Sequence, residues 1–167
     1  MAARLAKVVM VAALAAFALL VAADNVFDYG ANFEFVRHVL SMDTTFHDPA
    51  LTGRAIMASA LWHAAYIAII AAEGATGVLL AAGALALWRA RRGPAQAFQH
   101  AKRWAIAGAT LGFLVWFFGF MVVGGEWFAM WQSAVWNGQQ GAFRFYTALL
   151  GVLIFVNQPD SDPRGTG

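Results

Sequence analysis

Long apolar runs constrain this chain more than any other feature of its sequence. The clearest run extends from Trp104 to Gly125, where 22 uncharged residues lie between Arg103 and Glu126. A helix needs about 20 mostly apolar residues to cross the hydrocarbon core of a bilayer. We therefore predict that this segment spans a membrane.

Three further runs approach or exceed that length. Residues 55–88 contain 34 residues, with Glu73 as the only formal charge. Residues 137–157 form a weaker span, because the required length takes it back past Arg144. Residues 5–23 form the first span, although Lys7 interrupts the run and a cleaved signal peptide is the alternative. We favour a retained helix, since the run is long for the apolar part of a signal peptide.

These spans predict an all-α fold: an integral membrane four-helix bundle with short external interfacial helices, in a single domain over residues 1–157. Asp48-Pro49 is typical of a helix start, so the second helix is expected to begin before its span. Asn32 is expected to start a surface helix, and the tryptophans around Trp131 fit an interfacial aromatic belt. The tail, residues 158–167, is rich in Pro, Gly and Asp and is expected to be disordered and cytoplasmic.

The distribution of charge predicts the orientation and excludes several classes of function. Of the 11 basic residues, eight fall on the side of the two chain ends, whereas Arg37, Arg54 and Arg144 fall on the other side. Because basic residues favour the cytoplasmic side, both termini are expected there, in a bacterial inner membrane. Basic residues beside spans do not indicate nucleic acid. The absence of cysteine excludes disulfides and thiolate metal sites.

The single carboxylate within the second span, Glu73, is the strongest candidate for a site. A charged residue at the centre of a spanning helix is unfavourable by roughly 2.5–3.5 kcal/mol, so it usually faces the bundle interior. Tyr66 lies two helical turns earlier on the same face, and His63 flanks that face. Arg144 is close enough in depth to join them, although snorkelling to the membrane surface is the favoured alternative for its side chain. Glu73 either binds a proton or a ligand, or fixes helix packing.

Cofactor, metal and catalytic sites are not predicted. His63 and His38 are the pair to consider for haem, but only His63 lies inside a span. No metal-binding spacing or catalytic constellation is present. We therefore expect no cofactor, no metal and no enzymatic activity.

Gly108, Gly112 and Gly119 form a candidate helix-packing face in the third span. Small residues at these spacings let helices approach closely. The pattern is compatible with packing inside one chain or with dimerisation.

Several polar motifs resemble a bacterial family of predicted small integral membrane proteins that is catalogued as a domain of unknown function. The motifs are Asp28-Tyr29, Asn32-Phe33, residues 35–44, Trp62-His63, Tyr66, Glu73, Glu126-Trp127, residues 130–133, residues 136–139 and residues 143–145. The resemblance covers nearly the whole chain. It implies a retained first helix and a four-span fold, and it implies no activity.

Two functions remain open on these observations. The first is an accessory or assembly protein that docks in the bilayer beside a larger membrane complex or a second copy of itself. The second is a proton-linked or small-solute transport component that uses Glu73 in a homo-oligomer. An enzyme or quinone-binding subunit is a weaker third alternative.

Overall fold

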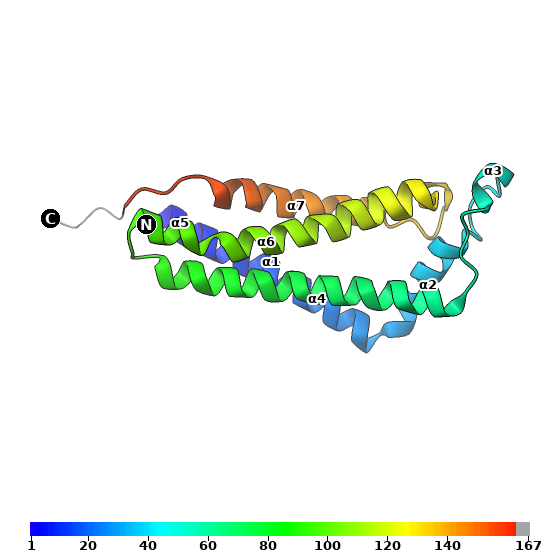
Figure 1. Ribbon diagram of the computed structural model, residues 1–167, viewed down its shortest axis with the longest axis horizontal. Helices are drawn as coiled ribbons and strands as arrows, with labels where there is room; N and C mark the ends of the chain where they lie inside the picture. The colour runs from blue at the N-terminus through cyan, green and yellow to red at the C-terminus, as the bar shows by residue number, and fades with distance from the viewer. Residues whose placement is uncertain (163–167) are drawn as a thin grey trace.

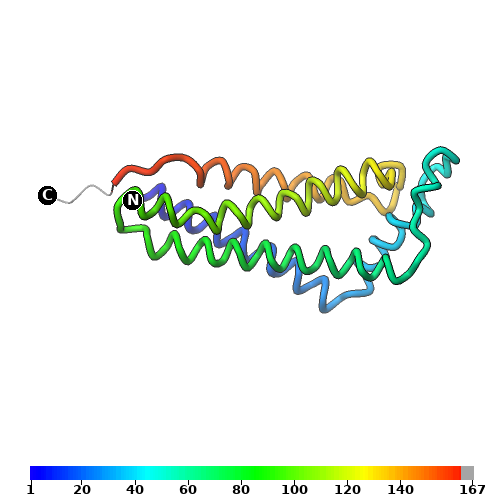
Figure 2. Tube along the Cα trace, in the orientation of Figure 1, coloured from blue at the N-terminus to red at the C-terminus, as the bar shows by residue number. Residues whose placement is uncertain are grey.

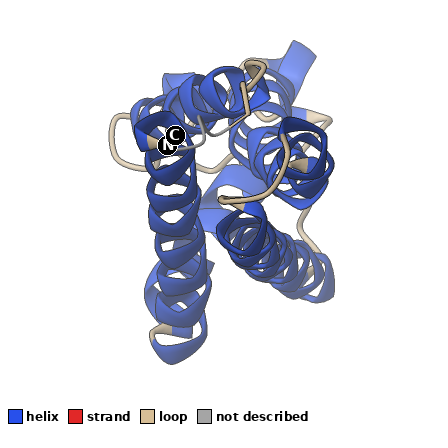
Figure 3. Cartoon of the chain, turned by 90° about the vertical axis from the view of Figure 1, so that its left-hand side faces the viewer, coloured by secondary structure: helices blue, strands red, loops and turns tan. Residues whose placement is uncertain are grey.

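The computed structural model describes residues 1–162, which contain helices and loops but no strand (Figure 1 and Figure 3). Four helical segments are long and apolar enough to cross a membrane, which confirms the predicted all-α membrane bundle. They are α1 (Ala2–Phe27), α4 (Ser59–Ala90), the continuous segment Ala95–Trp127, and α7 (Gln139–Asn157). Residues 163–167 of the expected disordered tail, with Arg164 among the basic residues, lie outside the described residues.

The chain runs back and forth along one axis (Figure 2). The third segment consists of α5 (Ala95–Ala101), α6 (Arg103–Phe113) and η1 (Leu114–Trp127). One end of the bundle, here called the terminal end, holds the start of α1, the α4–α5 turn and the segment after α7. The opposite end, here called the loop end, holds α2 (Tyr29–Ser41), α3 (Pro49–Thr52) and η2 (Met130–Gln132).

The helix boundaries at the loop end differ from those predicted. Helix α2 begins at Tyr29, before the expected start at Asn32. Asp48 does cap a helix, and its Oδ1 accepts a hydrogen bond from the backbone N–H of Ala50 at 2.9 Å. That helix is the short α3 and not the start of the second span. After α3, Ile56 N–H donates to Leu40 O of α2 at 2.8 Å, so the connection lies against α2 before α4 begins.

Facing stripes of buried residues hold α1 against α4. The buried stripe of α1 repeats every three or four residues, as expected for one helix face, over Val8, Val11, Ala15, Ala18, Ala22 and Asn25. The buried face of α4 has similar spacings and includes Tyr66, Glu73, Gly77, Leu80, Gly83 and Leu87. Helix α1 packs mainly on α4, and α4 also packs on α6. The last residue of the first stripe, Asn25, therefore faces the Glu73 region of the second.

Glycines allow α4 and α6 to approach closely. A Cβ at Gly83 would lie 2.5 Å from the backbone nitrogen of Ala105, and a Cβ at Gly108 would lie 2.9 Å from that of Leu80. Gly112 is equally crowded, by the side chains of Thr76 and Leu149. Two members of the predicted packing face, Gly108 and Gly112, therefore pack inside the bundle.

Gly119, the third member of that predicted face, does not pack with the other two. A Cβ at this position would meet only the carbonyl oxygen of Leu114, at 4.0 Å, in its own helix. The reason is that η1 is a π-helix, whose hydrogen bonds span five residues, as from Phe128 N–H to Val123 O at 3.0 Å. Gly119 follows Gly112 by seven residues, which equals two turns of an α-helix. A π-helix has more residues in each turn, so Gly119 points away from the face that holds Gly108 and Gly112.

Buried charges close the terminal end of the bundle. The Asp160 carboxylate oxygen Oδ2 lies 2.8 Å from Lys7 Nζ and 2.6 Å from Lys102 Nζ. Both ammonium groups also donate to the carbonyl oxygen of Gln158 at 2.7 Å. The residue exposures are 2% for Lys7 and 0% for Lys102, so a buried cluster of charges joins α1 to the junction between α5 and α6.

The segment 158–162, for which the sequence predicts disorder, is packed against the bundle. Besides Asp160, its Ser161 carbonyl accepts a hydrogen bond from Arg4 at 2.8 Å. Arg4 also donates to the carbonyl oxygens of Arg91 and Gly93, in the α4–α5 turn. The composition of this segment predicted disorder, because composition gives no information about binding partners such as Arg4 and Lys7 at the other end of the chain.

The charge cluster predicts a loss of stability in acid. Burial raises the pKa of Asp160, but the hydrogen bonds and charges of Lys102 and Lys7 outweigh it and hold that pKa below its ordinary value. A carboxyl pKa lowered by folding stabilises the protein above the ordinary value of about 3.9, and this stabilisation is lost as pH falls through the folded-state pKa. We expect unfolding measured below about pH 4 to depend less on pH in Asp160→Asn than in wild type. Equal pH dependence in the two proteins would contradict this assignment.

Candidate functional site

The Glu73 carboxylate lies in the interior of the bundle, near the middle of α4. The residue is 2% exposed. Its Oε2 accepts a hydrogen bond from the side-chain amide of Asn25, on α1, at 2.7 Å. Among residues 1–162 no Lys, Arg or His forms an ion pair with it. The Glu73 carboxyl group is thus held by a neutral partner, and none of the described side chains supplies a counter-charge.

Asn25 is the centre of a hydrogen-bonded network that reaches the surface of the loop end. Its Oδ1 accepts from the side-chain amide of Asn32, on α2, at 2.7 Å. The hydroxyl of Tyr66 donates to its backbone carbonyl oxygen at 3.1 Å. Asn32 is exposed, whereas Asn25, Tyr66 and Glu73 are buried. Hydrogen bonds therefore connect an exposed amide to the carboxylate through one side chain.

His63 lies at the rim of this network and does not contact Glu73. Its Nδ1 is 2.8 Å from the hydroxyl oxygen of Tyr29. Its ring stacks on Phe33, with centroids 4.2 Å apart. Tyr29 in turn packs against Tyr66, with centroids 4.6 Å apart. Since His63 is exposed, the rings of Tyr29 and Phe33 lie between it and the buried Tyr66.

Arg144, the partner considered for Glu73 from the sequence, has an exposed side chain on α7. It forms no ion pair with any acidic residue in the described part of the chain. The sequence left two positions open for the Arg144 side chain, beside Glu73 or at the membrane surface, and the structure does not bring it to Glu73. The partner that the sequence prediction missed is Asn25, which lies just beyond the predicted first span, residues 5–23. The three- and four-residue spacing that leads from Val8 to Asn25 is the signal that identifies it.

The other histidine considered as a haem ligand, His38, takes part in a surface cluster at the loop end. Its Nδ1 lies 2.8 Å from Asp43 Oδ1, and its Nε2 lies 2.8 Å from an Arg37 nitrogen. The ring stacks on Trp136, with centroids 4.5 Å apart. These contacts fix α2 against the loop that precedes α7, and they engage both ring nitrogens.

A cavity of about 280 Å³ adjoins the carboxylate. Its polar lining comes from Glu73, Tyr66, Asn25 and Asn32, and aromatic rings provide much of the remainder. The full lining is Val21, Asn25, Asn32, Phe35, Val36, Tyr66, Ile69, Glu73, Trp116, Phe120, Gly138, Gly141, Ala142 and Phe145. A cavity with few convergent polar groups and an apolar wall is the usual form of a small-molecule site.

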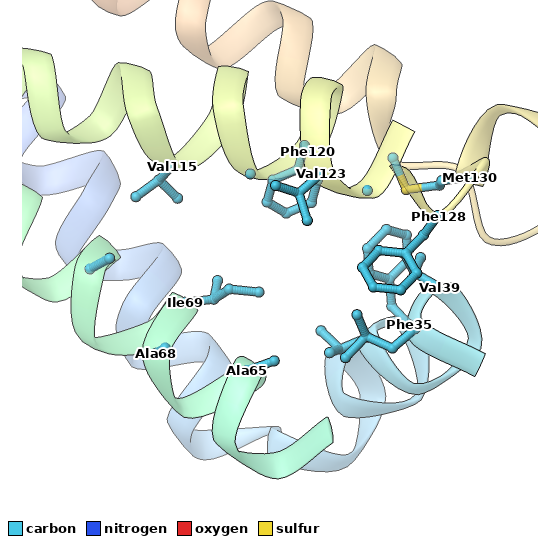
Figure 4. Close-up of a pocket in the computed structure, with 15 residues that line it drawn as sticks. Phe35, Val39, Ala65, Ala68, Ile69, Val115, Phe120, Val123, Phe128 and Met130 are labelled. Atoms are coloured by element: carbon cyan, nitrogen blue, oxygen red, sulfur yellow. The ribbon is translucent and has the colours of Figure 1, made fainter. Parts of the chain in front are cut away.

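A second cavity, of about 320 Å³, lies between α4, η1 and α2 (Figure 4). Its lining is apolar, and Ala65, Ala68, Val115 and Val123 are among the side chains drawn around it. Four residues, Phe35, Val36, Ile69 and Phe120, line both cavities. The polar and the apolar cavity therefore share one wall.

The hydroxyl of Tyr66 is expected to contribute modestly to the stability of the site. Tyr66→Phe removes one O–H donor, which is shared between the backbone carbonyl oxygen of Asn25 at 3.1 Å and its Oδ1 at 3.3 Å, and retains the ring packing. We expect the free energy of unfolding to fall by about 0.5–1 kcal/mol, as for other single hydrogen bonds in membrane bundles. Unfolding in mixtures of sodium dodecyl sulfate and a mild detergent measures this. A Tyr66→Phe variant more stable than wild type would contradict a stabilising hydrogen bond between Tyr66 and Asn25.

Comparison with known proteins assigns the chain to a family but to no activity. The model of a family described as predicted small integral membrane protein (DUF2165) matches residues 3–159, which is nearly the whole chain. No curated protein and no solved structure matches. The match includes all four spans and every residue of the site. The chain therefore belongs to this family of predicted small integral membrane proteins.

Proposed function

We propose that this protein is an accessory membrane protein that binds a small ligand within the bilayer at Glu73. One observation carries the proposal: a carboxylate 2% exposed, held by a neutral amide, lines a cavity of about 280 Å³. Charged residues inside spanning helices are unfavourable and generally mark a site. A role in packing alone does not need a cavity beside the charge.

The arrangement favours binding over conduction through a single chain. The network reaches the surface at the loop end, through Asn32. Toward the terminal end the interior is filled by buried apolar side chains, among them Leu80 and Leu87, and then by the Asp160 cluster. Transport would require a path between several copies of the chain. We therefore propose that the site opens only toward the loop end.

We propose an accessory role for two reasons. The chain that holds the site is small, and the residues described around Glu73 form no catalytic constellation. We place the protein in the inner membrane with both termini cytoplasmic, because most basic residues lie at the terminal end. The loop end and its site would then face outward. A larger membrane complex is the proposed partner.

Native mass spectrometry of the protein extracted from its own membrane in a mild detergent tests ligand binding. We expect a bound small molecule on wild type and its loss from Glu73→Gln. Glu126→Gln, the same chemical change at an exposed glutamate, is expected to retain it. Bare wild-type protein, or the same adduct on all three proteins, would contradict the proposal.

The same extract tests the accessory role through proteins that copurify with the chain. We expect larger membrane proteins to be recovered with wild type in amounts comparable to those of the chain itself. Recovery of the chain alone would count against an accessory role and leave ligand binding to be judged from the adduct.

A further inference from the structure

The two cavities have complementary chemistry along one wall. Ala72 lines the apolar cavity, and the next residue, Glu73, lines the polar one. The 15 residues around the apolar cavity carry no charged side chain. A molecule whose polar head reached the carboxylate would therefore have room for a hydrocarbon tail across the shared wall. This reasoning rests on the proposed function and concerns the chemical class of its ligand.

The charge of the polar cavity decides which head group fits. Glu73 is the only formally charged residue in its lining. Aromatic rings, including Trp116, Phe120 and Phe145, surround it, and ring faces attract cations. A carboxyl group that ionises in this interior needs a counter-charge, so a cation is the natural complement of the ionised form of Glu73. A fatty acid would bring two negative charges together, and a neutral alcohol would leave the charge uncompensated.

We infer that the ligand is an amphiphilic amine, whose protonated nitrogen lies against Glu73 and whose hydrocarbon tail lies in the apolar cavity. The amine donates a hydrogen bond to the carboxylate, alongside the amide of Asn25. The tail passes the shared residues Ile69 and Phe120 and extends between α4 and η1 (Figure 4).

The wide η1 helix provides part of the space for the tail. Gly119 lines the apolar cavity, and a Cβ there would find only open space and its own helix backbone. Gly119 therefore points away from the packing face and toward the apolar cavity. A larger side chain at this position should shorten the space available to the tail.

Three probes with equal chains test the head group: dodecylamine, 1-dodecanol and dodecanoate. They are titrated against the full chain in nanodiscs of phosphatidylcholine, and the bound stoichiometry is read by native mass spectrometry. We expect one dodecylamine bound more tightly than either other probe by about tenfold or more, and a loss of about tenfold or more in Glu73→Gln. Glu126→Gln should bind as wild type does.

A second pair of variants tests the tail. Gly119→Leu fills the apolar cavity and is expected to weaken dodecylamine by about tenfold or more, with a smaller effect on hexylamine. Gly151→Leu is the matched control, because Gly151 also faces open space but lines neither cavity. If Gly119→Leu fails to fold by circular dichroism, Ala68→Leu, in the same lining, replaces it.

The possible outcomes separate this inference from the proposed function. Binding of dodecanol or dodecanoate as tight as that of dodecylamine would overturn the amine assignment, as would amine binding unchanged in Glu73→Gln. An unchanged dodecylamine affinity in the cavity-filling variant would overturn the placement of the tail. If the native adduct depends on Glu73 while no amine binds, the proposed function stands and the inferred ligand class is wrong.

Discussion

Asp160→Ala is expected to lower the free energy of unfolding by about 3 kcal/mol, because it leaves buried ammonium groups without a counter-charge. The Asp160 carboxylate lies 2.8 Å from Lys7 and 2.6 Å from Lys102, and both lysines are fully buried. Breaking a buried pair by removing one partner is much more harmful than losing an exposed pair. The effect extends across the fold, since the cluster joins α1, the junction between α5 and α6, and the segment after α7.

Unfolding in mixtures of sodium dodecyl sulfate and a mild detergent, followed by circular dichroism, measures this change. Asp24→Ala is the control, because Asp24 is an exposed carboxylate at the loop end. It is expected to change the free energy of unfolding by less than about 1 kcal/mol. Equal stabilities for the two variants would show that the charge cluster contributes nothing and that residues 158–162 do not pack as described.

Gly83→Ala is expected to lower the free energy of unfolding by about 2 kcal/mol, although it adds only one methyl group. The new Cβ would lie 2.5 Å from the backbone nitrogen of Ala105 and 2.8 Å from its Cα. Backbone atoms cannot rotate away as a flexible side chain can. Helices α4 and α6 would have to separate, which would loosen the packing around Leu80 and Gly108 as well.

Gly151→Ala provides the matched control for this substitution. Gly151 is also a helical glycine, and a Cβ there meets nothing within 4 Å. Alanine is more favourable than glycine in a helix by about 1 kcal/mol, so this variant is expected to be as stable as wild type or more stable. Equal destabilisation by both substitutions would contradict the close approach of α4 and α6.

The spans follow from the sequence because the bilayer imposes a simple rule on composition. A helix inside lipid must satisfy its backbone internally and present apolar side chains for about 20 residues. The run from Trp104 to Gly125 meets that rule and lies within a continuous helical segment. The same rule identified Glu73 as an exception and placed it inside the bundle, where it lies.

The rotation of each helix was harder to predict than its depth. Arg144 was considered as a partner of Glu73 because of its depth, but depth alone does not tell which side chain faces Glu73, and the partner in the structure is Asn25. Gly119 was assigned to the wrong face because the change from α-helix to π-helix in η1 has no clear signature in the residues. Such errors arise wherever a prediction assumes one helical period throughout a span.

The charges at the terminal end illustrate a second limit of reasoning from sequence. In the sequence prediction, Arg4 and Lys7 were counted among the basic residues that set the orientation. In the structure they are 3% and 2% exposed and are bound by groups from the α4–α5 turn and from residues 158–162. The partners are about 90 and 150 residues away along the chain, so no local pattern reveals them.

Glu73 borders an open cavity, whereas the interior of the bundle from Leu80 toward the terminal end is filled. Because the chain has no cysteine, Glu73→Cys and Leu80→Cys each carry a single thiol. Leu80 lies two turns further along the same face of α4 and is 1% exposed in the filled core. In nanodiscs, 2-aminoethyl methanethiosulfonate is expected to modify the Glu73→Cys thiol rapidly and the Leu80→Cys thiol slowly or not at all. Equal reaction rates for the two thiols would contradict the site.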